Sequence, residues 1–501
     1  GFEELAERAR DYPLDEVAEI TEIPAEEIAA AARRIGAAER AILQWGVAID
    51  QIKETIPTAQ AVLSLFEITG NIGKPGTMQQ PASILNYAAG WGSEFLTPEQ
   101  EAKRIGQEAH PLIKMGFQEC VTDDYIRCLE TGEPYPIKVA WMQTTNPLAC
   151  TGVDAKRTLA AHMNIDTIVC VDLFMTPTAM ALADYFLPAC TYAERNGLRI
   201  GDGAQRAETI NKAIEPLGES RSDMQITLDI GKRISPEAWP WETVEDMYSD
   251  ILEETGHSFE EMQELAPGYP PFDYRMHEKG LLRTDGNPGF QTATGRIELW
   301  STLYNSLGLD PLPSYEEPVP SPRSTPELAE EYPLVLTTGK RSFEFFHSEW
   351  RQANTTSREL HPVPYFDIHP DTAAKYGLHE GEWAWIENQM GKCRQVVRLN
   401  ATLDERVVST EHGWWFPEQE AAEPSLFGVF DCNPNNLIPM CENGDSGYGA
   451  PIKCGMAKVY PCTPENSAPE DQPTYQVTAT NGYTHGPSHK SDTPSFYDQN
   501  K

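Results

Sequence analysis

The chain has 501 residues, 40% of them hydrophobic, so it can bury the cores of two to four domains. Its 76 acidic side chains outnumber its 39 basic ones and give a formal net charge of −37 at pH 7. Such a charge repels nucleic acids and anionic membrane surfaces, so we exclude nucleic acid as the expected partner. The sequence has no apolar run of the roughly 18 residues that a membrane span needs, and we predict no transmembrane segment.

The ten cysteines form no Cys-x-x-Cys pair and no tight ligand cluster. A zinc finger, a self-contained iron–sulfur site and a small disulfide scaffold are therefore not expected. Cys432, Cys441, Cys454 and Cys462 share one Gly-, Pro- and Asn-rich segment. Free thiols are the default interpretation there, and pairing or metal binding is the alternative.

The first hundred residues show an alternation that is typical of α/β proteins. Residues 24–35 predict a helix, because a proline and two acids open the segment and a glycine follows it. The apolar residues 41–47 predict a short strand. Residues 55–69 predict a second helix, which ends at the glycine-rich loop of residues 70–76.

The same alternation recurs further along. We predict in order a strand, a helix, a strand and a helix at residues 137–141, 154–162, 167–171 and 178–184. This order predicts a parallel sheet with right-handed crossovers. Ligands of such sheets lie beyond the carboxyl ends of the strands, where Asn146 follows one strand and Asp172 and Thr176 follow the next.

These polar residues also have simpler explanations. Taken alone, Asp172 is better explained as a helix cap or turn former, and Asn146 before a proline as a turn residue. Two polar loops at the same edge of one sheet nevertheless favour a site for a nucleotide-like ligand.

Residues 332–415 predict a small β-barrel module. Its first strand runs into residues 337–341 (TTGKR), whose hydroxyls can donate hydrogen bonds, whose glycine permits a close backbone approach and whose two cations can neutralise phosphate. His347 and Arg351 stand four residues apart and would share a helix face, so Arg351 adds a third cation. A solvated surface face is the alternative.

The rest of the barrel is interpreted as scaffold. Residues 365–370 predict a strand and 371–376 a short helix, with His369 as a turn residue. Residues 381–387 and 392–399 predict a hairpin. The sequence contains no Gly-x-Ser-x-Gly, His-Glu-x-x-His or Walker A motif, so a self-sufficient hydrolase or kinase is not expected.

Several motifs occur in the order of one known family. They are residues 70–76 (GNIGKPG), Asn146-Pro147, Asp172 with Thr176 and Thr178, residues 183–188 (ADYFLP) with Glu194 and Gly197, residues 292–299 and the barrel. Over nearly all of residues 1–462 the chain thereby resembles the molybdopterin oxidoreductases of the dimethyl sulfoxide reductase type. The resemblance implies an α/β protein with Rossmann-like parallel sheet domains followed by a C-terminal double-psi β-barrel. These would hold bis-molybdopterin guanine dinucleotide with molybdenum or tungsten.

The resemblance also implies contacts with this cofactor. Asn146, Asp172 and Thr176 would contact a dinucleotide in the α/β part. The implied contacts in the barrel are Thr338, Gly339, Arg341, His347 and Ser348, with Asn436 and Lys453 nearer the pterin. No catalytic residue and no metal ligand is implied within this chain.

The expected domains are, in order, the C-terminal part of a Rossmann-like domain (1–110), a second α/β dinucleotide-binding region (111–310), a linker (311–330), the molybdopterin dinucleotide-binding β-barrel (331–462) and a disordered tail (463–501). The family's N-terminal iron–sulfur domain, its metal-ligating residue and the first halves of both dinucleotide-binding regions have no counterpart here. We therefore expect the C-terminal part of a longer catalytic subunit, with the [4Fe–4S] cluster in the missing part.

By resemblance, the whole enzyme would act on a small substrate by oxygen-atom transfer or reductive dehydroxylation, with an iron–sulfur electron-transfer subunit as partner. Residues 427–436 and 447–449, together with residues 383–387, most resemble the anaerobic branch that contains catechol dehydroxylases, with acetylene hydratase and thiosulfate or polysulfide reductases as relatives. A binding or assembly subunit that keeps the fold without the metal is the alternative. A twin-arginine signal in preceding residues would predict export from the cytoplasm, and its absence a cytoplasmic enzyme.

Overall fold

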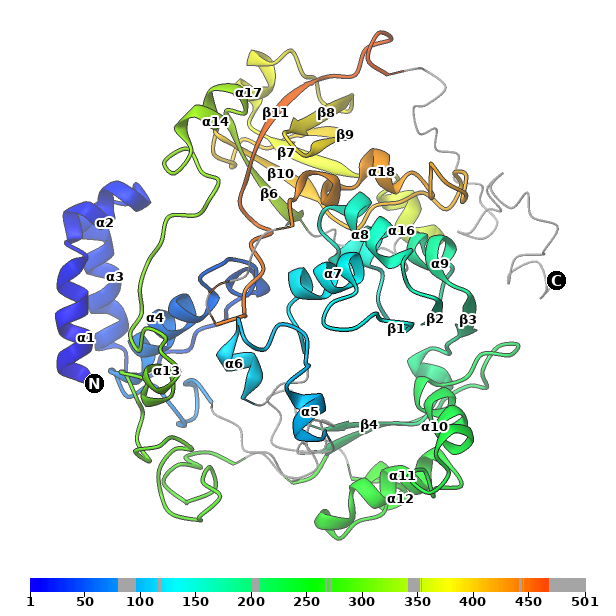
Figure 1. The fold of residues 1–501 in the computed structure, drawn as a ribbon. Helices are drawn as coiled ribbons and strands as arrows, with labels where there is room; N and C mark the ends of the chain where they lie inside the picture. The colour runs from blue at the N-terminus through cyan, green and yellow to red at the C-terminus, as the bar shows by residue number, and fades with distance from the viewer. Residues whose placement is uncertain are drawn as a thin grey trace.

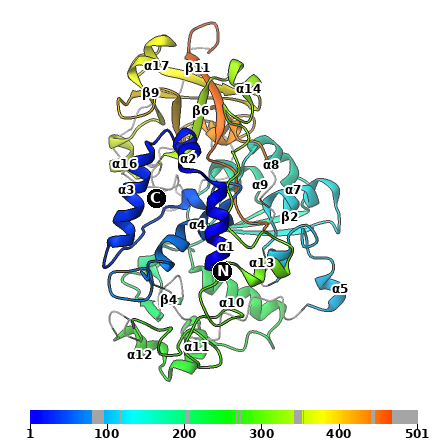
Figure 2. The ribbon, with the colours of Figure 1, turned by 90° about the vertical axis from the view of Figure 1, so that its left-hand side faces the viewer.

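A computed structural model describes residues 1–79, 96–115, 119–200, 207–265, 268–270, 273–340, 352, 354–440, 444 and 446–467. Figure 1 shows a β-barrel at one end, a three-stranded sheet with its helices in the middle and a mainly helical lobe at the other end. The N-terminal helices run along one side, as Figure 2 shows face on. In the described part of the chain, no helix is long and apolar enough to cross a membrane.

The N-terminal part is helical. It contains α1 (Phe2–Arg8), α2 (Leu14–Thr21), α3 (Ala25–Ala37) and α4 (Thr55–Glu67), followed by the short helices α5 (Pro98–Glu101) and α6 (Pro111–Lys114). The helices predicted at residues 24–35 and 55–69 are confirmed as α3 and α4. None of the side chains of α1, α2 and α3 is fully buried.

The prediction of a strand at residues 41–47 is wrong. No described strand pairs with this segment, and a 3-10 turn at Val47–Ile49 (η2) ends it. The backbone amide of Ala41 donates instead to the side-chain oxygen of Asn71, at 2.8 Å. Strand propensity is realised only where another strand satisfies the backbone groups.

The central sheet is parallel, in the order β1–β2–β3. Its strands are β1 (Val139–Gln143), β2 (Thr167–Asp172) and β3 (Tyr185–Pro188), and its helices are α7 (Thr122–Thr131), α8 (Ala155–His162) and α9 (Pro177–Leu182). The predicted alternation and parallel pairing are confirmed, with β1 two residues later than expected. Ile126, Met142 and Ile168 belong to the core between this sheet and its helices. In Figure 1 these helices lie on the barrel side of the sheet.

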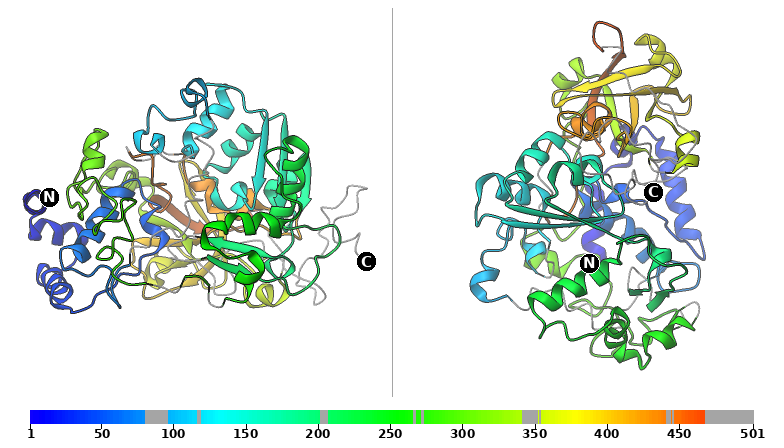
Figure 3. Two further views of the ribbon diagram at one scale, coloured as in Figure 1. Left: turned by 90° about the horizontal axis from the view of Figure 1, so that it is seen from below. Right: turned by 90° about the vertical axis from the view of Figure 1, so that its right-hand side faces the viewer.

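A small lobe follows the sheet and lies opposite the barrel (Figure 3, right). It consists of the antiparallel strands β4 (Gly197–Ile200) and β5 (Ala207–Ile210) and the helices α10 (Asp223–Ile234), α11 (Val244–Ile251) and α12 (Phe259–Gln263). Leu228, Tyr248 and Phe259 are in its core. A largely irregular segment with α13 (Thr302–Ser306) and α14 (Pro326–Glu331) then leads to the barrel.

Six strands close the barrel in the order β10-β6-β11-β8-β9-β7. They are β6 (Leu334–Lys340), β7 (Tyr365–Ile368), β8 (Trp383–Asn388), β9 (Gly391–Leu399), β10 (Val407–Glu411) and β11 (Gly455–Pro461), with the helices α16 (Thr355–Leu360), α17 (Pro370–Lys375) and α18 (Val429–Cys432). The predicted β8–β9 hairpin and the short helix α17 are confirmed. The barrel closes through β11, which lies beyond the 332–415 module but inside the barrel domain expected at residues 331–462.

Candidate functional site

A cavity of about 640 Å³ opens where the three parallel strands end. Its wall includes Thr144, Thr145 and Asn146 after β1, Asp172 at the end of β2, and Thr191 and Arg195 after β3. This is the edge at which parallel α/β sheets bind ligands, and the volume suits a small organic ligand such as a nucleotide. The strand-end polar loops predicted from the sequence therefore share one cavity.

The turn after β1 gives this cavity its shape. Thr144 has a φ of 53°, a left-handed conformation that β-branched residues rarely adopt. Its amide donates to the carbonyl of Val171 at 3.0 Å, which extends the parallel pairing by one bond before the chain turns away. A strained residue of this kind costs about 1–3 kcal/mol and is typical of functional turns.

Two carboxylates and one guanidinium line the cavity. Asp172 accepts a hydrogen bond from the amide of Leu173 at 2.7 Å, and Asp223 accepts one from the side chain of Gln143 at 3.0 Å. Arg195 supplies the positive charge. The carboxylates can accept hydrogen bonds from amino and hydroxyl groups, while Arg195 and the threonine hydroxyls can bind phosphate oxygens.

Sequence reasoning missed Arg195 and Asp223. Arg195 follows a capping box that Thr191 and Glu194 form directly after β3, which is a local signal that could have identified this loop. Asp223 is the first residue of α10, which tertiary packing brings to the cavity, and nothing in its sequence neighbourhood indicates this position.

Two predicted contacts of the α/β part hold α9 in place. Asn146 lines the cavity but is buried, and its side-chain oxygen accepts a hydrogen bond from the Thr178 hydroxyl at 2.7 Å. Thr176 is 1% exposed and caps α9 by accepting from the amide of Ala179 at 3.2 Å. A dinucleotide contact by Thr176 stays a prediction, and its burial favours the structural role.

A second group of predicted residues meets at the end of β6. The Thr338 hydroxyl donates to the carbonyl of Ile452 at 2.7 Å, and the Lys453 ammonium donates to the carbonyl of Thr338, also at 2.7 Å. Gly339 has a φ of 82°, and a Cβ atom there would collide with the Lys453 ammonium. Thr338, Gly339 and Lys453 thus meet because β11 pairs antiparallel with β6.

Lys340 does not act as the free cation that the sequence predicts. Its ammonium forms an ion pair with Asp367, which also binds Arg398 at 2.8 Å. Burial lowers the pKa of Lys340, although the ion pair opposes this effect. The cation that lies beside Gly339 at the end of β6 is Lys453, not Lys340.

The remaining predicted barrel contacts are less defined. Asn436 donates to the carbonyls of Val429 and Asn433, at 3.2 and 2.9 Å, and its buried side-chain oxygen has no hydrogen-bond partner among the described residues. Arg341, His347 and Ser348 lie outside the described residues, as does Arg351.

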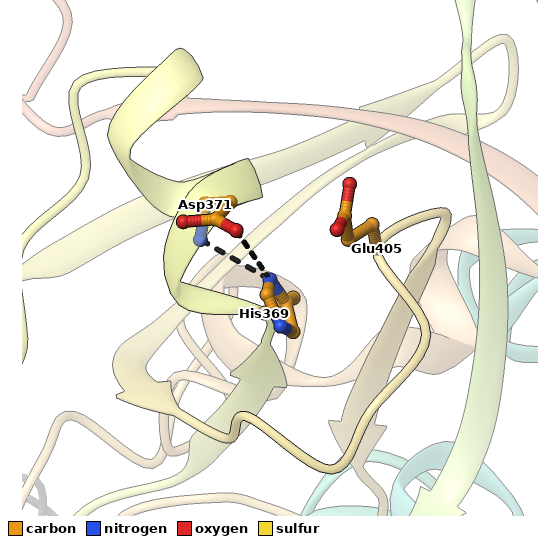
Figure 4. A group of neighbouring side chains, drawn as sticks. All are labelled: His369, Asp371 and Glu405. Atoms are coloured by element: carbon orange, nitrogen blue, oxygen red, sulfur yellow. Dashed lines mark hydrogen bonds and ion pairs between the residues drawn. The ribbon is translucent and has the colours of Figure 1, made fainter.

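His369, Asp371 and Glu405 form the one group of three or more potential metal-ligating side chains found in the described part of the chain (Figure 4). His369 caps α17, because its Nδ1 accepts from the amide of Asp371 at 3.2 Å. That lone pair is therefore already used, and Asp371 is exposed. A helix cap explains the group, in agreement with the predicted turn role of His369. None of the nine described cysteines forms a disulfide.

The cavity at the sheet edge and the cationic strand end of the barrel are both of the kind that binds nucleotide-containing ligands. Residues 19–233 match the family "Molybdopterin oxidoreductase", and residues 334–444 match the "Molydopterin dinucleotide binding domain". The chain belongs to the molybdopterin oxidoreductase family, and the predicted fold and resemblance are confirmed.

Relatives and a solved structure agree with this assignment. Acetylene hydratase of Syntrophotalea acetylenica is 30% identical over 497 residues, which cover 92% of this chain and 66% of the relative. Dopamine dehydroxylase of Eggerthella lenta is 30% identical over 553 residues, which cover 93% of this chain and 53% of the relative. The structure of acetylene hydratase from Pelobacter acetylenicus matches 92% of this chain and 66% of its own with a TM-score of 0.83 at 30% identity. The chain thus spans less than two thirds of these relatives.

Proposed function

We propose that this chain is the cofactor-binding part of a bis-molybdopterin guanine dinucleotide enzyme with molybdenum or tungsten. The enzyme acts on a small substrate by oxygen-atom transfer or reductive dehydroxylation. The observation that carries this proposal is the cavity at the carboxyl edge of the parallel sheet, which Asp172, Arg195 and Asp223 help to line, in a chain that also contains a dinucleotide-binding barrel.

The residues of both sites fit such a cofactor. A cavity of about 640 Å³ has room for one nucleotide end of it. Asp172 and Asp223 would accept hydrogen bonds from the amino and hydroxyl groups of guanosine, and Arg195 would bind its phosphates. In the barrel, Lys453 would supply positive charge where Gly339 permits close approach. When bound, the metal and its pterins supply the redox chemistry, and this chain's residues bind and orient them.

The names of the relatives support a small organic substrate. They include a hydratase, a dehydroxylase and the formate dehydrogenase H of Escherichia coli. We further propose that the longer polypeptide carries a [4Fe–4S] cluster and passes electrons to or from an iron–sulfur subunit. A twin-arginine signal, if it has one, would direct its export from the cytoplasm.

Metal analysis tests this proposal. The native protein, purified from its source without oxygen, is expected to contain about one molybdenum or tungsten atom per chain by mass spectrometry, as enzymes of this kind require. A protein with a native circular-dichroism spectrum but neither metal would contradict the proposal. It would favour a binding or assembly subunit that retains the fold.

The Asp172→Ala variant is expected to lower the affinity for the guanine dinucleotide about 10- to 150-fold, because a hydrogen bond to a charged group contributes about 1.5–3 kcal/mol. The measurement is the dinucleotide retained per chain after gel filtration at several protein concentrations. Asp166→Ala is the matched control, because Asp166 lies before the other end of the same strand and is 69% exposed. Equal retention by the two variants would remove Asp172 from the site.

A further inference from the structure

Asp223 lines the cavity with one of its carboxylate oxygens already bound to another side chain. The side-chain amide of Gln143, the last residue of β1, donates a hydrogen bond to Oδ1 of Asp223 at 3.0 Å. The other oxygen, Oδ2, has no hydrogen-bond or ion-pair partner among the residues that the structure describes. Asp223 therefore keeps one oxygen for a ligand of the cavity that it lines, and Gln143 restrains its orientation.

A second hydrogen bond fixes the orientation of the Gln143 amide. Trp141 and Gln143 stand two residues apart on β1, so their side chains lie on the same face of the sheet. Nε1 of Trp141 donates to Oε1 of Gln143 at 2.8 Å. Because an indole N–H can only donate, the amide oxygen must face Trp141 and the amide NH2 group must face Asp223. The three side chains thus form a series of hydrogen bonds that runs in one direction, from the indole to the carboxylate.

A structural tie between β1 and α10 is the simpler explanation of these bonds. The helix is, however, held without them, because Ser222 caps it and Leu228 is completely buried in the core of the lobe. Asp223 is the one residue of α10 among the described residues that line the cavity. Gln143 and Trp141 are not among those lining residues, so an effect of either on the ligand would act through Asp223.

We propose that Gln143, oriented by Trp141, is a positioning residue that holds Asp223 for a hydrogen bond to the nucleotide in this cavity. The inference rests on the proposed function, since it takes this nucleotide to be the guanosine end of a molybdopterin dinucleotide. With Oδ1 engaged by Gln143, Asp223 presents Oδ2 to an N–H or O–H group of the ligand. A side chain that is oriented before binding loses less conformational freedom on binding, which raises the affinity.

The Gln143→Met variant of the longer protein is expected to lower the affinity for the dinucleotide about 3- to 10-fold, the usual effect of losing one hydrogen bond. The measurement is the dinucleotide retained per chain after gel filtration at several protein concentrations. Trp141→Phe, which removes the indole N–H, should act in the same direction and add no further loss to Gln143→Met. Gln225→Met is the matched control, because Gln225 donates to Asp229 at 2.8 Å on α10 and neither is among the described residues of the cavity wall.

A double substitution separates positioning from a structural tie. If Gln143 acts through Asp223, Gln143→Met lowers the affinity only while Asp223 is present and adds no loss to Asp223→Ala. A structural tie predicts the same additional loss in both backgrounds. Additive losses, or equal retention by Gln143→Met and Gln225→Met, would overturn the inference and leave the proposed function standing. An unsubstituted protein that retains no dinucleotide would contradict the proposed function and this inference with it.

Discussion

The Glu411→Ala variant is expected to lower the free energy of unfolding by about 3 kcal/mol or more. Glu411 ends β10 and is completely buried, and one of its carboxylate oxygens accepts three hydrogen bonds. The donors are Nε2 of His361 at 2.8 Å, the amide of Tyr365 at 3.0 Å and Nε1 of Trp414 at 3.1 Å. Each buried donor left without an acceptor costs about 1–3 kcal/mol, so the three together give the largest stability effect that we expect.

Urea unfolding at constant slope measures this effect. Glu411→Gln keeps one acceptor oxygen and is expected to lose less stability than Glu411→Ala. Glu359→Ala is the matched control, because Glu359 is exposed on the neighbouring helix α16 and its loss should change stability by no more than about 0.5 kcal/mol. If Glu411→Ala and Glu359→Ala unfold at the same urea concentration, the carboxylate does not hold these barrel segments together.

The Gly339→Ala variant is expected to lower cofactor retention about 10- to 150-fold. The added Cβ atom displaces the Lys453 ammonium, and a charge-assisted contact of the kind that Lys453 would make with phosphate is worth about 1.5–3 kcal/mol. The measurement is molybdopterin dinucleotide content per chain of the longer protein, read beside its unfolding temperature.

Gly377→Ala is the control that isolates this cause. Gly377 has a φ of 67°, close to the 82° of Gly339, but no atom lies within 4 Å of where its Cβ would be. Both variants therefore carry similar backbone strain of about 1–2 kcal/mol, and only Gly339→Ala moves Lys453. Lys453→Ala should reproduce the cofactor loss without the strain. If Gly377→Ala loses as much cofactor as Gly339→Ala, backbone strain alone explains the effect.

Elements whose local pattern agrees with their surroundings were predictable. The apolar β-branched run of β2, the proline-started helix α3 and the hairpin β8–β9 each satisfy their backbone groups within a short segment or with a neighbour in sequence. Residues 41–47 have the same apolar character as β2 but no strand beside them, so the predicted strand does not form. Strand propensity describes the intrinsic preference of a segment. Whether the strand forms depends on whether another strand is available to pair with it.

The two candidate sites also contain some residues that local sequence patterns identify and others that only tertiary contacts bring together. Asp172 and Asn146 were identifiable because a polar residue after a buried strand marks the binding edge of a parallel sheet. Asp223 and the meeting of Gly339 with Lys453 join residues far apart in the chain, so local patterns do not reveal them. Lys340 was assigned to phosphate from its neighbours in sequence, whereas its true partner, Asp367, lies on another strand.

The sequence by itself determined the α/β class, the parallel sheet, the barrel and the family, because periodicity and strand-end motifs are local and keep their order along the chain. Only the tertiary structure decided which cation lies at the barrel strand end and between which two strands β11 pairs. These depend on pairing register and on burial, which are set by contacts between segments that the chain keeps far apart.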